Sequence, residues 1–139
     1  MTALVPRLLL CHKHRTSARL HFLRFAHGLL GFSPLPPGMQ IAATRSPGTV
    51  VPHPAAWVHE AELTLGLAPH ALAAEPDFHA EARSGADTIP ILLACFTALD
   101  LPQGLAPRLG ARWQLITDAK DLSPAERELL RLGYEFMIG

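Results

Sequence analysis

Apolar residues recur with the spacing of a helix between positions 54 and 65. Four of them fall on one stripe of a 3.6-residue period: Trp57, Val58, Ala61 and Leu65. Pro54 suits the first helical position, where its missing N–H costs nothing, and Gly66 can end the helix in a left-handed conformation. The pattern therefore predicts a helix over residues 54–65.

A second and clearer stripe lies over residues 122–137. Ser123 is a good N-cap, Pro124 fits the first helical position, and Glu126 is placed to close a capping box. The apolar stripe contains five residues: Leu122, Ala125, Leu129, Leu132 and Phe136. We expect this helix to be the main packing element, with Leu129, Leu132 and Phe136 buried against Trp57, Phe78 and Phe96.

Other apolar segments permit more than one assignment. Residues 88–99 carry a helical stripe, but 91–97 is also a continuous apolar run that periodicity alone cannot distinguish from a buried strand. Residues 112–117 alternate as a strand does, and a short helix is expected over 76–83. The preferred fold is mostly α, a small domain of about four to five short helices. The alternative is α+β, with a two-stranded element at 91–97 and 112–117.

The N-terminal part of the chain differs in composition from the rest. Residues 1–59 contain no Asp or Glu and six basic residues: Arg7, Lys13, Arg15, Arg19, Arg24 and Arg45. Six prolines lie within residues 33–54, which is typical of an extended linker. We therefore expect residues 1–51 to form a basic leader and linker outside the fold, and 52–139 to form a single small helical domain.

This basic segment has several alternative interpretations. It could be a targeting segment, an arm that binds anionic membranes or nucleic acid, or translated sequence upstream of a true start at Met39. Its most apolar stretch, residues 20–32, is interrupted by histidines and an arginine and is shorter than a bilayer requires. No transmembrane segment is expected.

Residues 122–134 resemble the opening helix of helix-turn-helix domains of the sigma-factor type. The resemblance covers about a tenth of the chain and rests on a capped amphipathic helix. Binding of DNA by such a domain also needs a recognition helix that follows, and only five residues come after Tyr134. Specific nucleic-acid binding by this route is not expected.

Residues with recognisable chemistry are few. Cys11, His12 and His14 are weak candidates for a metal site, since zinc and copper accept such donors, but their spacing matches no established motif. The chain has no glycine-rich phosphate loop and no Gly-x-Ser-x-Gly elbow. The sequence therefore indicates no catalytic residue and no cofactor, and an enzyme is not the preferred interpretation.

The two cysteines, Cys11 and Cys95, lie in unrelated sequence contexts, and Cys95 has the surroundings of a small apolar core residue. Two cysteines do not make the framework of a disulfide-dense domain. A reducing compartment, the cytoplasm, is therefore the expected location.

These observations favour a small non-enzymatic accessory or adaptor protein that acts by protein–protein contact or self-association. The candidate contact residues are Trp113, Tyr134 and Met137, because the helical projections do not place all of them inside. One alternative is a metal- or ligand-binding domain or enzyme subunit that uses His59, His79 and nearby carboxylates. A further alternative is a membrane- or nucleic-acid-associated protein that uses the basic leader.

Overall fold

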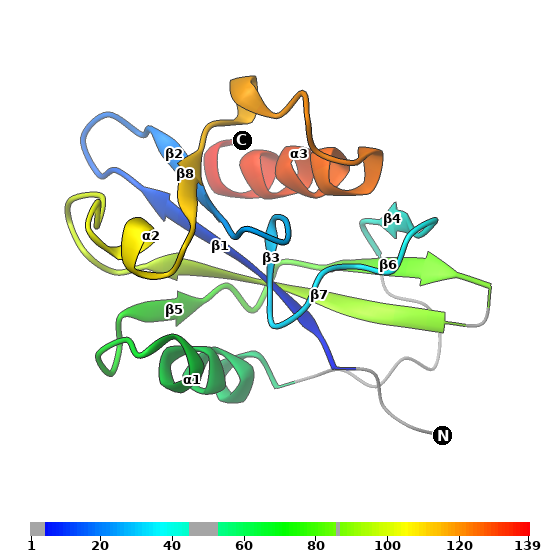
Figure 1. The fold of residues 1–139 in the computed structure, drawn as a ribbon, viewed down its shortest axis with the longest axis horizontal. Helices are drawn as coiled ribbons and strands as arrows, with labels where there is room; N and C mark the ends of the chain where they lie inside the picture. The colour runs from blue at the N-terminus through cyan, green and yellow to red at the C-terminus, as the bar shows by residue number, and fades with distance from the viewer. Residues whose placement is uncertain (1–4, 45–52, 86) are drawn as a thin grey trace.

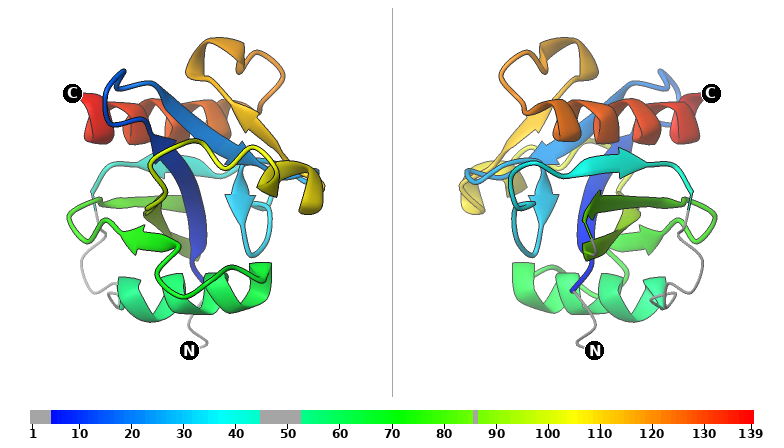
Figure 2. Two further views of the ribbon diagram at one scale, coloured as in Figure 1. Left: turned by 90° about the vertical axis from the view of Figure 1, so that its left-hand side faces the viewer. Right: turned by 90° about the vertical axis from the view of Figure 1, so that its right-hand side faces the viewer.

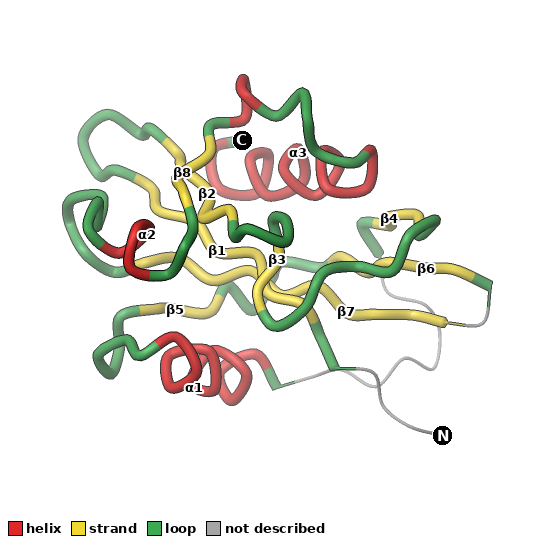
Figure 3. Tube along the Cα trace, in the orientation of Figure 1, coloured by secondary structure: helices red, strands yellow, loops and turns green. Residues whose placement is uncertain are grey.

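The computed structural model describes residues 5–44, 53–85 and 87–139. It shows a mixed eight-stranded sheet with helices on both faces (Figures 1 and 3). The predicted mostly helical fold is therefore wrong, since the described residues form eight strands and only three α-helices.

The strands are β1 (Arg7–Lys13), β2 (Leu20–Arg24), β3 (Leu30–Gly31), β4 (Gln40–Ala42), β5 (Leu72–Ala74), β6 (Ala80–Ser84), β7 (Asp87–Phe96) and β8 (Arg112–Gln114). The helices are α1 (Pro54–Leu65), α2 (Leu105–Arg108) and α3 (Pro124–Ile138), with a short 3₁₀ turn at Ile116–Asp118. The strand order is β4-β6-β7-β1-β2-β8, while β3 also pairs with β1 and β5 with β7.

The centre of the sheet is the parallel pair β1 and β7. Their register runs from Arg7 opposite Ile91 to Cys11 opposite Cys95. Strand β1 therefore lies inside the segment that was predicted to be a leader outside the fold, and β2, β3 and β4 also belong to that segment. The prediction is corrected for residues 5–44, while residues 1–4 and 45–51 lie outside the described residues.

The sheet separates two hydrophobic clusters because successive side chains of a strand point to opposite faces. Leu9 and Cys11 of β1 face the cluster that α3 covers, whereas Leu8 and Leu10 face the cluster that α1 covers. Figure 2 shows α3 and α1 on opposite sides of the sheet. All four of these β1 side chains are buried, which explains why the sequence of this strand is a continuous apolar run.

The two helices predicted from periodicity and caps are confirmed. Helix α1 begins at Pro54 and ends before Gly66, which has the left-handed φ of 67°. Helix α3 begins after Ser123, whose Oγ accepts a hydrogen bond from the Glu126 N–H.

The expected partners of α3 are only partly correct. Leu129 is fully buried, but Phe136 is 39% exposed and contacts Phe78 edge to face. Trp57 and Phe96 instead belong to the cluster on the α1 side of the sheet.

Two other helix assignments are wrong. Residues 88–99 and 76–83 were expected to be helical, but they contain most of β7 and most of β6. Strand β7 is covered on both faces, so apolar and polar residues do not alternate along it. The spacing of its apolar residues then matches a helical stripe by coincidence. The α+β alternative is wrong in its pairing: β7 pairs with β1, β5 and β6, and β8 pairs with β2.

Of the helices in the described ranges, none has the length and apolar character that a bilayer crossing requires.

Candidate ligand-binding site

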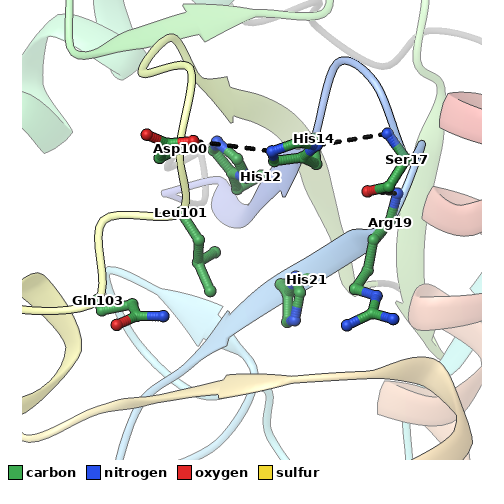
Figure 4. Close-up of a pocket in the computed structure, with 8 residues that line it drawn as sticks. All are labelled: His12, His14, Ser17, Arg19, His21, Asp100, Leu101 and Gln103. Atoms are coloured by element: carbon green, nitrogen blue, oxygen red, sulfur yellow. Dashed lines mark hydrogen bonds and ion pairs between the residues drawn. The ribbon is translucent and has the colours of Figure 1, made fainter.

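A polar cavity of about 680 Å³ opens between the β1–β2 hairpin and the loop that follows β7. Eight residues line this histidine pocket: His12, His14, Ser17, Arg19, His21, Asp100, Leu101 and Gln103. Figure 4 shows the first five coming from the hairpin and the last three from the loop opposite. The cavity volume lies in the range typical of small-molecule sites, roughly 300–1,000 Å³.

The hairpin turn fixes the position of His14. The turn is closed by two backbone bonds, from His14 N–H to Arg19 O at 2.9 Å and from Ala18 N–H to His14 O at 2.9 Å. The Ser17 N–H donates to His14 Nδ1 at 3.4 Å. Because a backbone N–H can only donate, Nδ1 carries the lone pair, and the proton of the neutral ring lies on Nε2. That Nε2 faces Asp100 Oδ1 at 3.7 Å.

His12 is completely buried, and its neighbours determine its tautomer. The Nε2 atom lies 2.8 Å from the Ala98 carbonyl oxygen, which can only accept, so Nε2–H is the donor. The Nδ1 atom is buried and has no hydrogen-bond partner among the described residues. A buried polar atom without a partner is unfavourable, and a ligand that supplies one would remove that cost.

His21 lies directly across the hairpin from His12 in the strand register. Its Nδ1 is likewise buried and unpartnered within the described part of the chain, and its ring meets Trp113 edge to face at 6.5 Å between centroids. Burial lowers the pKa of His21, and the electrostatic effects of Arg19 and His12 lower it further. The positive charge of Arg19 favours an anion beside His21, whereas burial disfavours any unpaired charge there.

Arg19 supplies the fixed positive charge of the pocket, and the three histidines add hydrogen-bonding groups. Arg19 and three histidines face a single acid, Asp100, whose side chain is 95% exposed. An exposed carboxylate is well solvated and offsets little of the positive potential inside the cavity. Gln103 and Ser17 add groups that can donate hydrogen bonds. The chemistry of the lining therefore suits a small anion.

The weak metal candidates that the sequence indicated do not come together in the structure. Cys11 and His12 are consecutive in β1, so their side chains point to opposite faces of the sheet, and only His12 and His14 line the pocket. Over the described ranges, no three His, Cys, Asp or Glu side chains lie close enough to hold a metal ion.

The other histidines named from the sequence are not brought together either. His59 Nδ1 lies 3.6 Å from Glu62 on α1, and His79 is exposed just before β6. Neither residue lines the histidine pocket.

The three predicted contact residues lie in different environments. Trp113 is half-buried against Phe96, and its Nε1–H donates to the Pro102 carbonyl at 3.4 Å. Met137 is partly buried in the cluster beneath α3, whereas Tyr134 is 37% exposed. Only Tyr134 therefore offers a large ring to solvent.

Sequence reasoning did not find Arg19, Asp100 or Gln103 as site residues, and it noted His21 only as a neighbour of the weak metal candidates. The available signal was the spacing of His12 and His14, which lie two residues apart and so share one face if the segment is a strand. That signal could be used only if a strand was assigned around His12 and His14, and this part of the chain had been interpreted as a leader outside the fold.

No family model and no curated protein sequence matches the chain.

Proposed function

We propose that this protein binds a small anionic molecule, one that carries a carboxylate or a phosphate group, in the histidine pocket. The observation that supports the proposal is the convergence of Arg19, His12, His14 and His21 on one cavity with a single exposed acid. A guanidinium pairs with the oxygens of either group by charge-assisted hydrogen bonds, which are stronger than neutral ones. This proposal belongs to the ligand-binding alternative that the sequence left open, although it uses different histidines.

The unpartnered Nδ1 atoms of His12 and His21 lie beneath the surface of the pocket. Because neither atom is exposed to solvent, a ligand contacts them only after the lining moves. The proposal therefore rests on the accessible part of the lining, above all on Arg19, which is exposed.

Trp113 provides a direct readout of binding because its ring lies beside His21. The chain has two tryptophans, so Trp57→Phe leaves Trp113 as the only indole fluorophore. The experiment is a fluorescence titration of this variant with inorganic phosphate and, separately, with citrate, at constant ionic strength and with chloride as the reference. We expect a saturable change with at least one of the two anions, and the difference between them identifies the preferred group.

Arg19→Gln tests whether the pocket is responsible. Loss of one charge-assisted contact should weaken binding by roughly tenfold. The matched control is Arg15→Gln, since Arg15 is exposed in the same turn and does not line the pocket. An equal loss in both variants would mean that net charge, rather than a site, attracts the anion, and a linear response to all salts would refute the proposal.

Contact with a protein partner, or self-association, is a second candidate. It is supported by Tyr134 and Phe136 of α3, which are 37% and 39% exposed. The experiment is sedimentation at several protein concentrations, comparing Tyr134→Ser with the control Leu63→Ser, since Leu63 is 64% exposed on α1. A loss of self-association in the first variant alone would favour this face of α3. A concentration-independent monomer in the unmodified protein would count against self-association.

Binding of anionic lipid or nucleic acid by the basic segment has less support. Arg24 Nη2 bonds Asp121 at 2.8 Å, Lys13 Nζ bonds the Met137 carbonyl at 3.0 Å, and Arg7 Nη1 bonds the Val5 carbonyl at 2.6 Å. These cations make contacts within the fold and do not form one exposed basic patch.

A cytoplasmic location remains part of the proposal, and both cysteines are free thiols.

A further inference from the structure

The two cysteines of the chain lie side by side, although 84 residues separate them in the sequence. Cys11 on β1 is the register partner of Cys95 on β7, and both side chains point to the face that α3 covers. Neighbouring strands are about 4.8 Å apart. That spacing falls within the range of Cα separations, about 4.4–6.8 Å, that a disulfide can span.

The two thiols differ in exposure. Cys11 is completely buried, whereas Cys95 is partly exposed. On its other side Cys95 pairs with Ala73 of β5, which is exposed, so the apolar cover over this face of the sheet ends beside Cys95. A reagent in solvent can therefore reach Cys95 but not Cys11.

The surroundings of Cys95 favour its thiolate. As a thiol, Cys95 donates to the Phe96 carbonyl oxygen at 3.7 Å. As a thiolate, it is favoured by hydrogen bonding from the Cys11 thiol and the Lys13 backbone N–H and by the positive charge of the Lys13 ammonium. These contacts lower the pKa of Cys95 to about 7, against the opposing effects of burial and Glu75. The same thiol–thiol hydrogen bond, together with burial, raises the pKa of Cys11.

From this geometry we infer that Cys95 and Cys11 form a hydroperoxide-sensitive modification site in which Cys95 is the attacking thiolate and Cys11 the resolving thiol. In the first step the Cys95 thiolate attacks one oxygen of the hydroperoxide, the O–O bond breaks, and hydroxide or an alkoxide leaves, so that sulfur becomes a sulfenic acid. In the second step the Cys11 sulfur attacks the Cys95 sulfur, its proton is transferred to the departing hydroxide, and water leaves as the disulfide forms. A small thiol reduces the disulfide by exchange and is itself oxidised.

The inference is independent of the proposed anion site, because the thiols and the histidine pocket lie on opposite faces of β1. Sequence reasoning interpreted Cys95 as a small core residue. Its neighbours Leu93 and Ala94 are indeed buried, but only the register with β1 brings a second thiol to it.

The test is oxidation of the full-length protein with a small excess of hydrogen peroxide, followed by intact mass and a non-reducing digest. Because the chain has only two cysteines, an intramolecular disulfide must join them. We expect the mass to fall by that of two hydrogens, one peptide pair to be linked, and dithiothreitol to restore both thiols. A product that stays at one added oxygen, or a dimer linked through Cys95, would overturn the assignment of Cys11 as the resolving thiol.

Two variants and one measurement on the unmodified protein separate the roles. Cys11→Ser should retain an added oxygen on Cys95, whereas Cys95→Ser should leave Cys11 unmodified at the same peroxide dose. In the unmodified protein, iodoacetamide should modify Cys95 roughly tenfold or more faster than Cys11, with a half-maximal rate near pH 7. Equal modification rates for the two thiols would refute the inference even if neither variant folds.

Discussion

Glu126 connects the start of α3 to the turn before β3, and its removal should destabilise the protein by about 2 kcal/mol. One carboxylate oxygen, Oε2, accepts a hydrogen bond from the Leu29 N–H at 2.6 Å. The other, Oε1, lies 3.2 Å from the hydroxyl of Ser123, the N-cap of α3. Leu29 is fully buried, so its N–H has no ready access to water once the carboxylate is gone.

The magnitude follows from three contributions. A buried backbone donor without a partner costs about 1–3 kcal/mol, and loss of part of a capping box adds roughly 0.5–1 kcal/mol. The better helix propensity of alanine returns a few tenths of a kcal/mol. A Cβ added at Gly28 would lie 2.5 Å from Glu126 Oε2, so the carboxylate packs directly against the backbone before Leu29. The sum is a loss of roughly 1–4 kcal/mol for Glu126→Ala, with a central value of about 2 kcal/mol.

Urea unfolding followed by circular dichroism measures this free energy, provided that the slope against denaturant stays constant between variants. The matched control is Glu128→Ala on the same helix, which removes only exposed contacts to Arg131 and should cost less than about 1 kcal/mol. Glu126→Gln should lie between the two variants because its amide oxygen still accepts from Leu29. If Glu126→Ala and Glu128→Ala agree within about 0.5 kcal/mol, the contact to Leu29 does not stabilise the fold in the way argued.

Two further predictions concern the core and the pocket. A Cβ added at Gly133 would lie 3.0 Å from buried atoms of Leu9 and Phe22. Gly133→Ala should therefore lower the free energy of unfolding in urea by about 1 kcal/mol, because overpacking outweighs the gain in helix propensity. A stabilised variant would contradict the packing. Because the pKa of His21 is lowered in the folded protein, the free energy of unfolding should fall as the pH drops through about 6.5, where the unfolded chain gains a proton that the folded one resists. Thermal unfolding of His21→Gln should be less sensitive to acid over this range, and an unchanged pH profile would contradict the interpretation.

Helices α1 and α3 could be predicted because their signals are local. Periodicity, a proline at the first position and a cap all fall within one segment, as Pro54 with Gly66 and Ser123 with Glu126 show. The sheet could not be predicted in the same way. Strands β1 and β7 are buried on both faces, so their sequences lack alternation, and their pairing joins residues more than 80 positions apart.

The charge asymmetry was a real signal that was misinterpreted. An acid-free half and an acidic half suggested a leader and an independent body, but the structure pairs them. Arg24 from the basic half binds Asp121 through two hydrogen bonds of 2.9 and 2.8 Å, and the guanidinium holds the pKa of that carboxyl below its usual value. One contact between oppositely charged residues of the two parts therefore joins β2 to the loop before α3.

The proposed anion site and the proposed thiol pair both depend on β1, whose successive side chains point to opposite faces of the sheet. In β1, Cys11 faces α3 and meets Cys95, while His12 faces the other side and meets the pocket. Shifting the register of β1 by one residue would exchange its two faces and place a histidine in the core and a cysteine in the pocket. Because the sheet lies between them, the effect of a substitution in the pocket can be interpreted separately from that of a substitution at the thiol pair.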